Sequence, residues 1–328
     1  MENLKSRVKL SVVILTIIAL FAALMLVVAC AKPVKSIGVA WATESNTQNM
    51  TLSFEKASTE VKAEVLPLVK YNEFTYDDDK LSGDCIDQYG MVSFAAAAKL
   101  KEKAYDKSNV AEVVAGHDAI VFPGGEDISP SLYKNPQAYY DYSEDPGFNA
   151  SRDVSDFILM NYCLDNNIKI MGICRGYQMY AVASGAEMIQ DLPTYYASKG
   201  IAYNKEHQKS GEINGKDVRG NHPVYVTDKN SFLYDCVKTD VIDKPYSSHH
   251  QAVLSVDPAK TKVTAVGRVN GLETIEALER ADSDVFSMFL QFHPEHALAR
   301  WVNDSADKDS FMSYDTSLSF FKYFIEHI

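Results

Sequence analysis

Short apolar runs alternate with amphipathic stretches along most of the chain. Three apolar runs end in polar residues or glycines and predict buried strands: Ser36–Trp41, His117–Phe122 and Ile168–Ile173. Helical spacing predicts four helices: Phe54–Val69 leading into a second strand near Val65, Met91–Lys107, Arg152–Asn166, and Cys174–Ser184 closed by Gly185. This alternation of strand and helix predicts an α/β fold with a parallel sheet.

The last third of the chain has a different pattern, in which strands dominate. Polar interruptions in its apolar runs predict partly exposed strands: Pro223–Val226, Ala252–Val256, Val263–Val269, Thr274–Leu278 and Val285–Phe292. A helix is predicted over Ser317–His327, and the acidic segment Tyr71–Gln88 is typical of a loop or insertion. Because no Pro/Gly/Ser-rich linker divides the chain after residue 36, we expect one domain over residues 36–328.

The amino terminus has the pattern of an export signal. Basic residues precede an apolar run, Leu10–Ala29, which ends in the sequence VVAC. This ending resembles the lipobox of bacterial lipoproteins. We therefore predict a signal peptide over residues 1–29, lipidation of Cys30, a tether over residues 30–35, and a chain anchored to a membrane in the cell envelope, outside the cytoplasm. An uncleaved membrane anchor is the alternative, and it predicts the same topology.

Composition and charge exclude several classes of protein. Of the 328 residues, 46% are hydrophobic and 23% are charged, which is ordinary for a globular protein and excludes a disordered chain. The formal charge is −12, and the sequence contains no Lys/Arg cluster, so we expect no nucleic-acid partner. Five cysteines in a chain of this length do not form a disulfide framework.

The segment GICRG places Cys174 between a predicted strand and a predicted helix. A residue at such a junction lies on a sharp turn, and glycines at Gly172 and Gly176 would let the backbone make that turn without a Cβ clash. The amino terminus of the following helix would stabilise a thiolate. The pattern indicates a nucleophilic cysteine, although a buried structural cysteine has the same local sequence.

Two further segments carry the groups that a cysteine nucleophile needs. His293 and Glu295, in QFHPEH, are two residues apart at the end of a predicted strand. In an extended chain they would project to the same side, as a base and its orienting carboxylate do. Gly124-Gly125 follows another strand, where backbone N–H groups could form an oxyanion hole.

Taken together, these segments resemble the class I glutamine amidotransferase-like superfamily, and within it the peptidase C26 group, which includes γ-glutamyl-γ-aminobutyrate hydrolase. The resemblance runs from about Ser36 to the carboxyl end. The segments that carry it are PGGEDISPSLY (123–133), Arg152-Asp153, MGICRGYQM (171–179), SSHHQA (247–252) and QFHPEH (291–296).

The resemblance implies a flavodoxin-like, doubly wound and mostly parallel sheet with added antiparallel strands. It also implies a catalytic triad of Cys174, His293 and Glu295. The oxyanion hole would be formed by the backbone N–H groups of Gly125 and Arg175. Residues near the substrate would be Gly124, Asp127, Arg152 and His250. The stretch Tyr71–Lys107 looks longer than usual for the family.

The expected activity is cysteine-dependent hydrolysis of the γ-glutamyl amide bond of a small molecule, through a γ-glutamyl thioester. No metal or organic cofactor is expected: His249-His250 lacks a third metal ligand at a recognisable spacing. One alternative is a glutaminase subunit that passes ammonia to a synthase; the 33 residues after Glu295 leave no room for a fused synthase. The other alternative is a lipid-anchored protein that binds γ-glutamyl compounds without turnover. The sequence leaves the oligomeric state open, a homodimer included.

Overall fold

The computed structural model describes residues 34–328, apart from residues 103, 140–146, 209–210, 214–215 and 219. The predicted signal peptide and Cys30 therefore lie outside the described residues. Ser36–Ile328 forms one compact unit. Among the described residues, no helix has both the length and the apolar character that crossing a bilayer requires.

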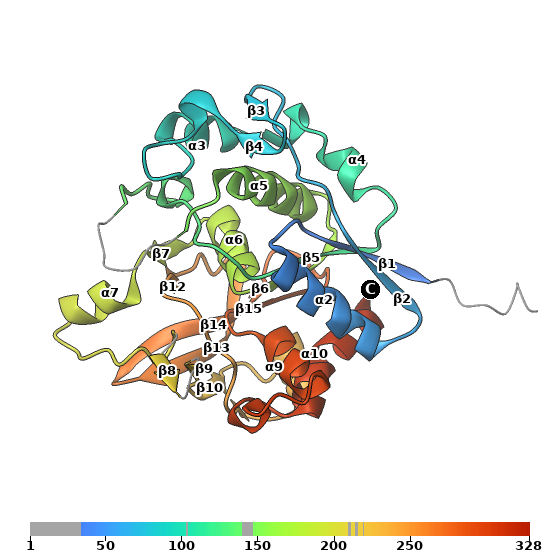
Figure 1. The fold of residues 1–328 in the computed structure, drawn as a ribbon, viewed down its shortest axis with the longest axis vertical. Helices are drawn as coiled ribbons and strands as arrows, with labels where there is room; N and C mark the ends of the chain where they lie inside the picture. Colours follow the sequence, from blue (N-terminus) through green and yellow to red (C-terminus); the bar gives the residue numbers. More distant parts are fainter. Residues whose placement is uncertain (1–33, 103, 140–146, 209–210, 214–215, 219) are drawn as a thin grey trace, which may run out of the picture. The chain divides into compact units, whose positions relative to one another are not determined.

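A nine-stranded sheet runs through this unit (Figure 1). Its first part has the order β2 (Val61–Val65), β1 (Lys35–Val39), β5 (Ala119–Phe122), β6 (Lys169–Ile173) and β15 (Ser287–Leu290). Strands β1, β5, β6 and β15 are parallel, and Ile170 of β6 pairs with Ile120 on one side and Ser287 on the other. Counted along the chain, this order is the 2-1-3-4-5 of flavodoxin-like sheets.

The second part of the sheet is antiparallel and continues from β15. It consists of β14 (Leu272–Arg280), β13 (Thr261–Val269), β10 (Val224–Val226) and β11 (Val241–Ile242). The predicted fold class, a doubly wound sheet with added antiparallel strands, is confirmed.

Helices cover both faces of the sheet because alternate residues of its strands point to opposite sides. Ile120 and Phe122 of β5 belong to one hydrophobic cluster, whereas Ala119 and Val121 belong to another. The first cluster includes residues of α3 (Phe94–Leu100), α4 (Val110–Val114), α5 (Ala150–Asp165) and α6 (Arg175–Ser184). The second includes residues of α2 (Glu44–Ala57), α9 (Pro294–Val302) and α10 (Tyr314–His327). Full burial of each large apolar side chain contributes about 1.5–3 kcal/mol.

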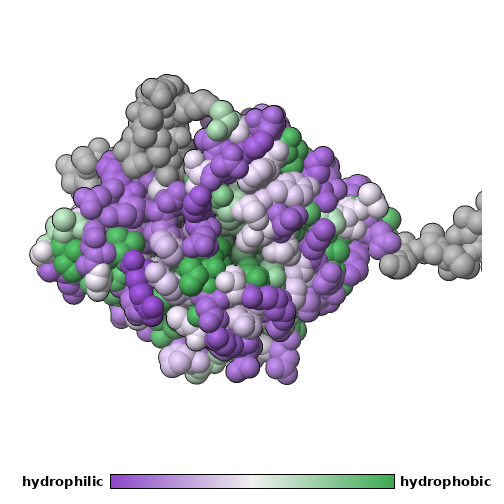
Figure 2. Space-filling model, turned by 90° about the horizontal axis from the view of Figure 1, so that it is seen from below, coloured by the Kyte–Doolittle hydropathy of each residue, from purple (hydrophilic) through white to green (hydrophobic). Residues whose placement is uncertain are grey.

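Smaller elements border the two layers. Three two-stranded sheets pair β3 (Tyr76–Asp77) with β4 (Lys80–Leu81), β7 (Glu187–Ile189) with β12 (Ala252–Ser255), and β8 (Gly211–Ile213) with β9 (Lys216–Val218). In the described part of the chain, the remaining α-helices are α7 (Leu192–Ser198) and α8 (Phe232–Val237). The short 3-10 turns there are Gly83–Cys85, Ala104–Lys107, Pro130–Leu132 and Lys308–Ser310. Hydrophilic residues cover most of the face shown in Figure 2, and hydrophobic residues reach it in small groups.

Three predicted elements differ from the structure. The helix predicted over Met91–Lys107 is only α3, which ends at Leu100, and the short 3-10 turn Ala104–Lys107 lies beyond it. The helix predicted over Phe54–Val69 is instead α2, which ends at Ala57, and β2 follows it. The sequence of α2 is mostly polar, and only Met50 and Phe54, one turn apart, bring large apolar side chains to the core. Hydrophobic periodicity therefore did not predict the first half of this helix. Strand β15 was expected to be partly exposed, but all its residues are buried because it lies between β6 and β14.

Candidate active site

Cys174 lies at the junction of β6 and α6, where its backbone adopts φ +50° and ψ −101°. A residue other than glycine in this region is strained, and such strain is commonly found at functional sites. The two neighbouring glycines avoid Cβ clashes, as expected. A Cβ at Gly176 would lie 2.3 Å from the carbonyl oxygen of Phe122, and one at Gly172 would lie 2.7 Å from the backbone of Gly176. The glycines let α6 pack closely on the sheet, and the strained turn falls on Cys174 itself.

His293 and Glu295 meet at the start of α9 rather than in an extended chain. Strand β15 ends at Leu290, His293 is the residue before α9, and Glu295 lies in the first turn of that helix. His293 Nδ1 is 2.7 Å from Glu295 Oε1, and both side chains are buried. The expected pair of His293 and Glu295 is formed. The extended chain from which we predicted it was wrong, because the two residues lie at the start of a helix. Pro294 occupies the first helical position, where the missing N–H leaves no hydrogen bond unmade.

The charges of the site favour a protonated His293. Burial alone would lower the pKa of His293, but the negative charges of Glu295 and Cys174 outweigh it and raise that pKa well above its usual value. Burial acts to raise the pKa of Glu295, yet the positive His293 holds it below its usual value. The side chains of His293 and Cys174 are close enough for Cys174 to contribute to this rise in pKa. Because Nδ1 faces Glu295, Nε2 is the ring nitrogen left for the thiol.

The Gly124-Gly125 turn after β5 packs directly against these side chains. A Cβ at Gly124 would lie 2.6 Å from His293 Cε1 and 3.6 Å from Cys174 Cβ. Gly125 has φ +152°, and a Cβ there would lie 1.9 Å from Arg152 Nη1. Only glycine fits at either position. The backbone N–H of Arg175 lies at the first position of α6, where a helix leaves its N–H groups without helical partners.

Buried charges hold this turn in place. Arg152 Nη2 donates to the carbonyl oxygens of Pro123 and Gly124, at 3.1 and 2.9 Å, and Nη1 is 2.6 Å from Glu126 Oε2. The Arg152 side chain is completely buried beneath the turn, and its place near the substrate stays a prediction.

The Arg175 side chain is also completely buried and links the same turn to α5. Its Nη1 donates to the carbonyl oxygens of Glu126 and Asp127, at 2.9 and 3.0 Å. Its Nη2 is 2.6 Å from Asp153 and its Nε is 3.1 Å from Asp156. The roles of Glu126, Asp153 and Asp156 were not predicted; the adjacent Arg152-Asp153 pair was the only signal of this network in the sequence.

Asp127 and His250 are brought together at the edge of the site. His250 Nε2 is 2.6 Å from Asp127 Oδ2, and its Nδ1 is 3.1 Å from Asp191 Oδ1. Burial alone would lower the pKa of His250, but the two carboxylates outweigh it and raise that pKa to about 10. His250 is two residues after Ser248, whose carbonyl oxygen is 4.0 Å from Cys174 Sγ. The structure thus presents an imidazolium between two carboxylates near the thiol.

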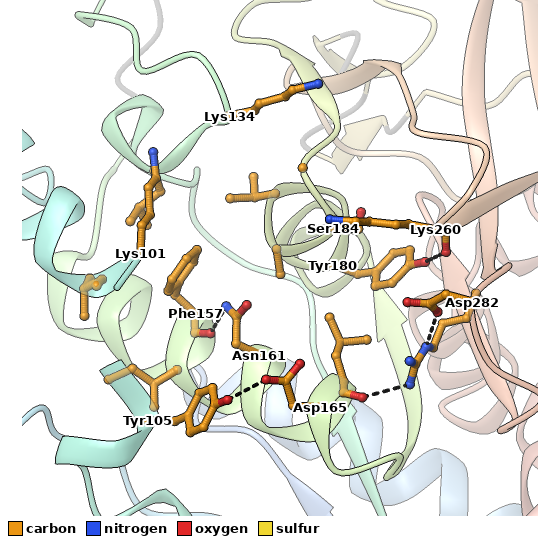
Figure 3. Close-up of a pocket in the computed structure, with 18 residues that line it drawn as sticks. Lys101, Tyr105, Lys134, Phe157, Asn161, Asp165, Tyr180, Ser184, Lys260 and Asp282 are labelled. Atoms are coloured by element: carbon orange, nitrogen blue, oxygen red, sulfur yellow. Dashed lines mark hydrogen bonds and ion pairs between the residues drawn. The ribbon is translucent and has the colours of Figure 1, made fainter. Parts of the chain in front are cut away.

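A separate pocket of about 480 Å³ lies away from these residues (Figure 3). It is lined by the carboxyl-terminal part of α6, including Tyr180 and Ser184, and by residues of α5 such as Phe157 and Asn161. Cys174 precedes the opposite end of α6, about 15 Å away at 1.5 Å per residue. This pocket therefore contains none of the predicted site residues.

The sheet and the junction of β6 and α6 at Cys174 are typical of glutamine amidotransferase-like hydrolases. Comparison with known proteins agrees with this class. The model of the Peptidase C26 family matches residues 85–295, and the chain belongs to this family.

The chain is 30% identical over 181 residues to Protein NtpR of Enterococcus hirae, covering 54% of this chain and 66% of that protein. It is 32% identical over 203 residues to the putative glutamine amidotransferase Rv2859c of Mycobacterium tuberculosis, covering 62% of this chain and 58% of that protein. It thus spans less than two thirds of both. A glutamine amidotransferase from Thermotoga maritima aligns over 90% of this chain and 98% of its own, at 15% identity and a TM-score of 0.47.

Proposed function

We propose that the chain hydrolyses γ-glutamyl amide bonds with Cys174 as the nucleophile. The observation that carries this proposal is the hydrogen-bonded pair His293–Glu295 beside Cys174, which lies at a strained strand–helix junction. A thiol, an imidazole and an orienting carboxylate in this arrangement are the components of acyl transfer through a thioester.

The residues support a complete reaction. The Cys174 thiolate attacks the γ-carbonyl carbon, and the developing oxyanion accepts hydrogen bonds from the N–H groups of Gly125 and Arg175. One such donor is typically worth about 2.7–4 kcal/mol. His293 donates its proton to the leaving amine as the C–N bond breaks, which leaves a γ-glutamyl thioester. Water then gives a proton to His293, attacks the thioester and releases glutamate, and the thiolate is regenerated.

Asp127 and His250 supply charges of both signs for the glutamate portion of a substrate. The Asp127 carboxylate suits an α-amino group, and the imidazolium of His250 suits an α-carboxylate. Their mutual ion pair keeps both side chains in fixed positions near Cys174. Recognition of this portion would leave the amine free to vary.

A glutaminase activity is the second candidate, because several relatives are described as putative glutamine amidotransferases. Glutamine is itself a γ-glutamyl amide whose leaving group is ammonia. The same site could release it, so substrate preference decides between the two candidates.

The test is glutamate release by the full chain in detergent and under reducing conditions. The substrates are γ-glutamyl-γ-aminobutyrate, γ-glutamyl dipeptides of both stereochemistries, polyglutamyl folate and glutamine. We expect release that is lost in Cys174→Ala and kept in Cys85→Ala, which removes a free thiol outside the site. Full activity in Cys174→Ala would exclude the proposal. Stoichiometric binding without product would favour a binding protein instead.

A further inference from the structure

Three histidines and one glutamate lie together outside the proposed reaction centre. His222 Nε2 is 3.0 Å, His207 Nδ1 is 3.3 Å and His249 Nε2 is 3.9 Å from the same atom, Glu276 Oε1. Each of these four side chains is at most 3% exposed. They come from four separate parts of the chain, and Glu276 lies on β14.

The outer nitrogen of each imidazole already has a hydrogen-bond partner. His249 Nδ1 is 2.9 Å from the carbonyl oxygen of Gln251, and His222 Nδ1 is 3.4 Å from that of Glu206. A carbonyl oxygen only accepts, so these two outer nitrogens carry the hydrogen and donate it. His207 Nε2 is 3.2 Å from the Thr274 hydroxyl. With the outer nitrogen protonated, the inner nitrogens of His207 and His249 present lone pairs, whereas His222 Nε2 donates to Glu276 Oε1 while no ion is bound.

The centre of the cluster therefore contains unsatisfied atoms. His207 Nδ1, His249 Nε2 and Glu276 Oε2 are buried and have no hydrogen-bond partner among the described residues. Unpaired polar atoms in the interior are destabilising. A cation at the centre would satisfy all of these atoms together.

We propose that His207, His222, His249 and Glu276 are the four ligands of a structural zinc ion. Imidazole and carboxylate groups are zinc ligands at about 2.0–2.2 Å, and the ligand atoms of such a tetrahedron lie roughly 3.3–3.5 Å apart. The three separations from Glu276 Oε1, 3.0–3.9 Å, bracket that value, and the ligand atoms of His207, His249 and Glu276 all lie within 4.8 Å of one another. Outer nitrogens that donate to backbone carbonyls are the usual support of metal-bound histidines. Four protein ligands would close the site, as in structural rather than catalytic zinc centres.

A glycine on the neighbouring strand leaves room for this site. A Cβ at Gly267 of β13 would lie 2.8 Å from His222 Nε2 and 3.1 Å from Glu276 Oε1. The absence of a side chain there keeps the cluster open on that side, where any other residue would press on two of the proposed ligands.

The ion would hold the loop of residues 247–249, which borders Cys174, in a fixed position. His249 N donates to the carbonyl oxygen of His207 at 2.8 Å, and Ser247 N donates to that of Gly220 at 3.0 Å. Ser248, between these two residues, has its carbonyl oxygen 4.0 Å from Cys174 Sγ. Zinc would thus hold the His207 and His249 segments on β14 without touching the reacting atoms. The proposal does not depend on the reaction assigned to Cys174.

The experiment measures zinc in the purified full chain after dialysis against metal-free buffer. We expect one zinc per chain in the wild type and in Cys174→Ala, and a loss of at least about tenfold in affinity in His249→Ala and in Glu276→Ala. His296→Ala is the matched control, because His296 belongs to the other group that could hold a metal, His293, Glu295 and His296. It should retain zinc.

A second measurement uses the wild-type chain alone, so that the result does not depend on variants that fold. After removal of metal, added Co²⁺ should give the visible spectrum of a tetrahedral site without thiolate charge transfer, and added Zn²⁺ should raise the Tm. A thiolate band that disappears in Cys174→Ala would place the metal at Cys174 and overturn the proposal. A folded wild-type chain that binds no zinc at micromolar concentration, with an unchanged Tm, would also overturn the proposal. The positive charge beside Glu276 would then come from a proton on the histidines instead of a metal ion.

Discussion

The guanidinium of Arg152 occupies the space that a side chain at Gly125 would need, since a Cβ there would lie 1.9 Å from Arg152 Nη1. The same guanidinium donates to the carbonyl oxygens of Pro123 and Gly124. The turn that could bind an oxyanion is thus shaped by a buried cation beneath it.

Gly125→Ala should displace this turn or Arg152. We expect kcat/KM to fall about 100-fold or more, the effect of losing one oxyanion donor. Gly83→Ala is the control, because Gly83 also has a positive φ, +66°, but no atom within 4 Å of its Cβ position. The control should lose a little stability and keep its activity. Equal activity in both variants would contradict the assigned role of the turn.

Glu295→Gln should lower the pKa of His293, because the carboxylate that stabilises the imidazolium is removed. We expect activity to fall about 100-fold. The alkaline limb of the pH–rate profile, where the imidazolium is lost, should move to lower pH. The check is a full profile for both proteins, together with thermal melting to show that the variant is folded. An unmoved limb would argue against the pairing of Glu295 with His293 during the reaction.

Asp153→Asn should destabilise the fold strongly. Asp153 is buried, lies 2.6 Å from Arg175 Nη2 and accepts a hydrogen bond from Ser129 N. Breaking a buried ion pair leaves an uncompensated charge and costs about 3–5 kcal/mol of unfolding free energy. Glu273→Gln breaks the exposed pair with Arg268 and should cost at most about 1 kcal/mol. Urea unfolding of both variants measures the difference, and equal losses would disagree with this account.

His250 should make stability depend on pH above neutrality. Its pKa is raised to about 10 in the folded chain, against about 6.5 in an unfolded one. A raised pKa contributes stability that is fully present below pH 6.5, roughly the unfolded value, and is lost as pH rises to about 10, by up to about 1.4 kcal/mol per pH unit. His250→Gln removes this contribution. The difference in unfolding free energy between wild type and variant should therefore shrink from pH 6 to pH 10; a constant difference would show that His250 is not charged in the fold.

Cys30→Ser tests the predicted lipid anchor. If the VVAC sequence directs lipidation, the wild-type chain should fractionate with membranes, and the mass of its amino-terminal peptide should include a diacylglyceryl group on Cys30. The variant should lack that mass. An amino-terminal peptide that still begins before residue 30 in the wild type would favour the uncleaved anchor.

The order of the main elements could be predicted from the sequence because local signals are strong there. Short apolar runs that end in polar residues or glycines marked β1, β5 and β6, and helical spacing with Gly185 at its end marked α6. The predicted positions of Cys174, His293 and Glu295 rested on GICRG and HPE, whose residue types are informative on their own. Helix α2 was misplaced because its first half is almost entirely polar.

Long-range geometry was decided only by the tertiary structure. The sequence placed Cys174 on a sharp turn, but only the packing of α6 on Phe122 shows which atoms require glycine at Gly172 and Gly176. The sequence likewise contained no sign that Glu126 and Asp156 surround the Arg152 guanidinium.

His249 shows the same division most clearly. The sequence offers only its neighbour His250, which turns instead to Asp127 and Asp191. Its actual neighbours, His207, His222 and Glu276, come from distant segments that meet where the antiparallel strands join the parallel ones. The sequence by itself determines residue types and local periodicity. Which side chains meet across the core depends on how the strands pair, and no local sequence pattern specifies that pairing.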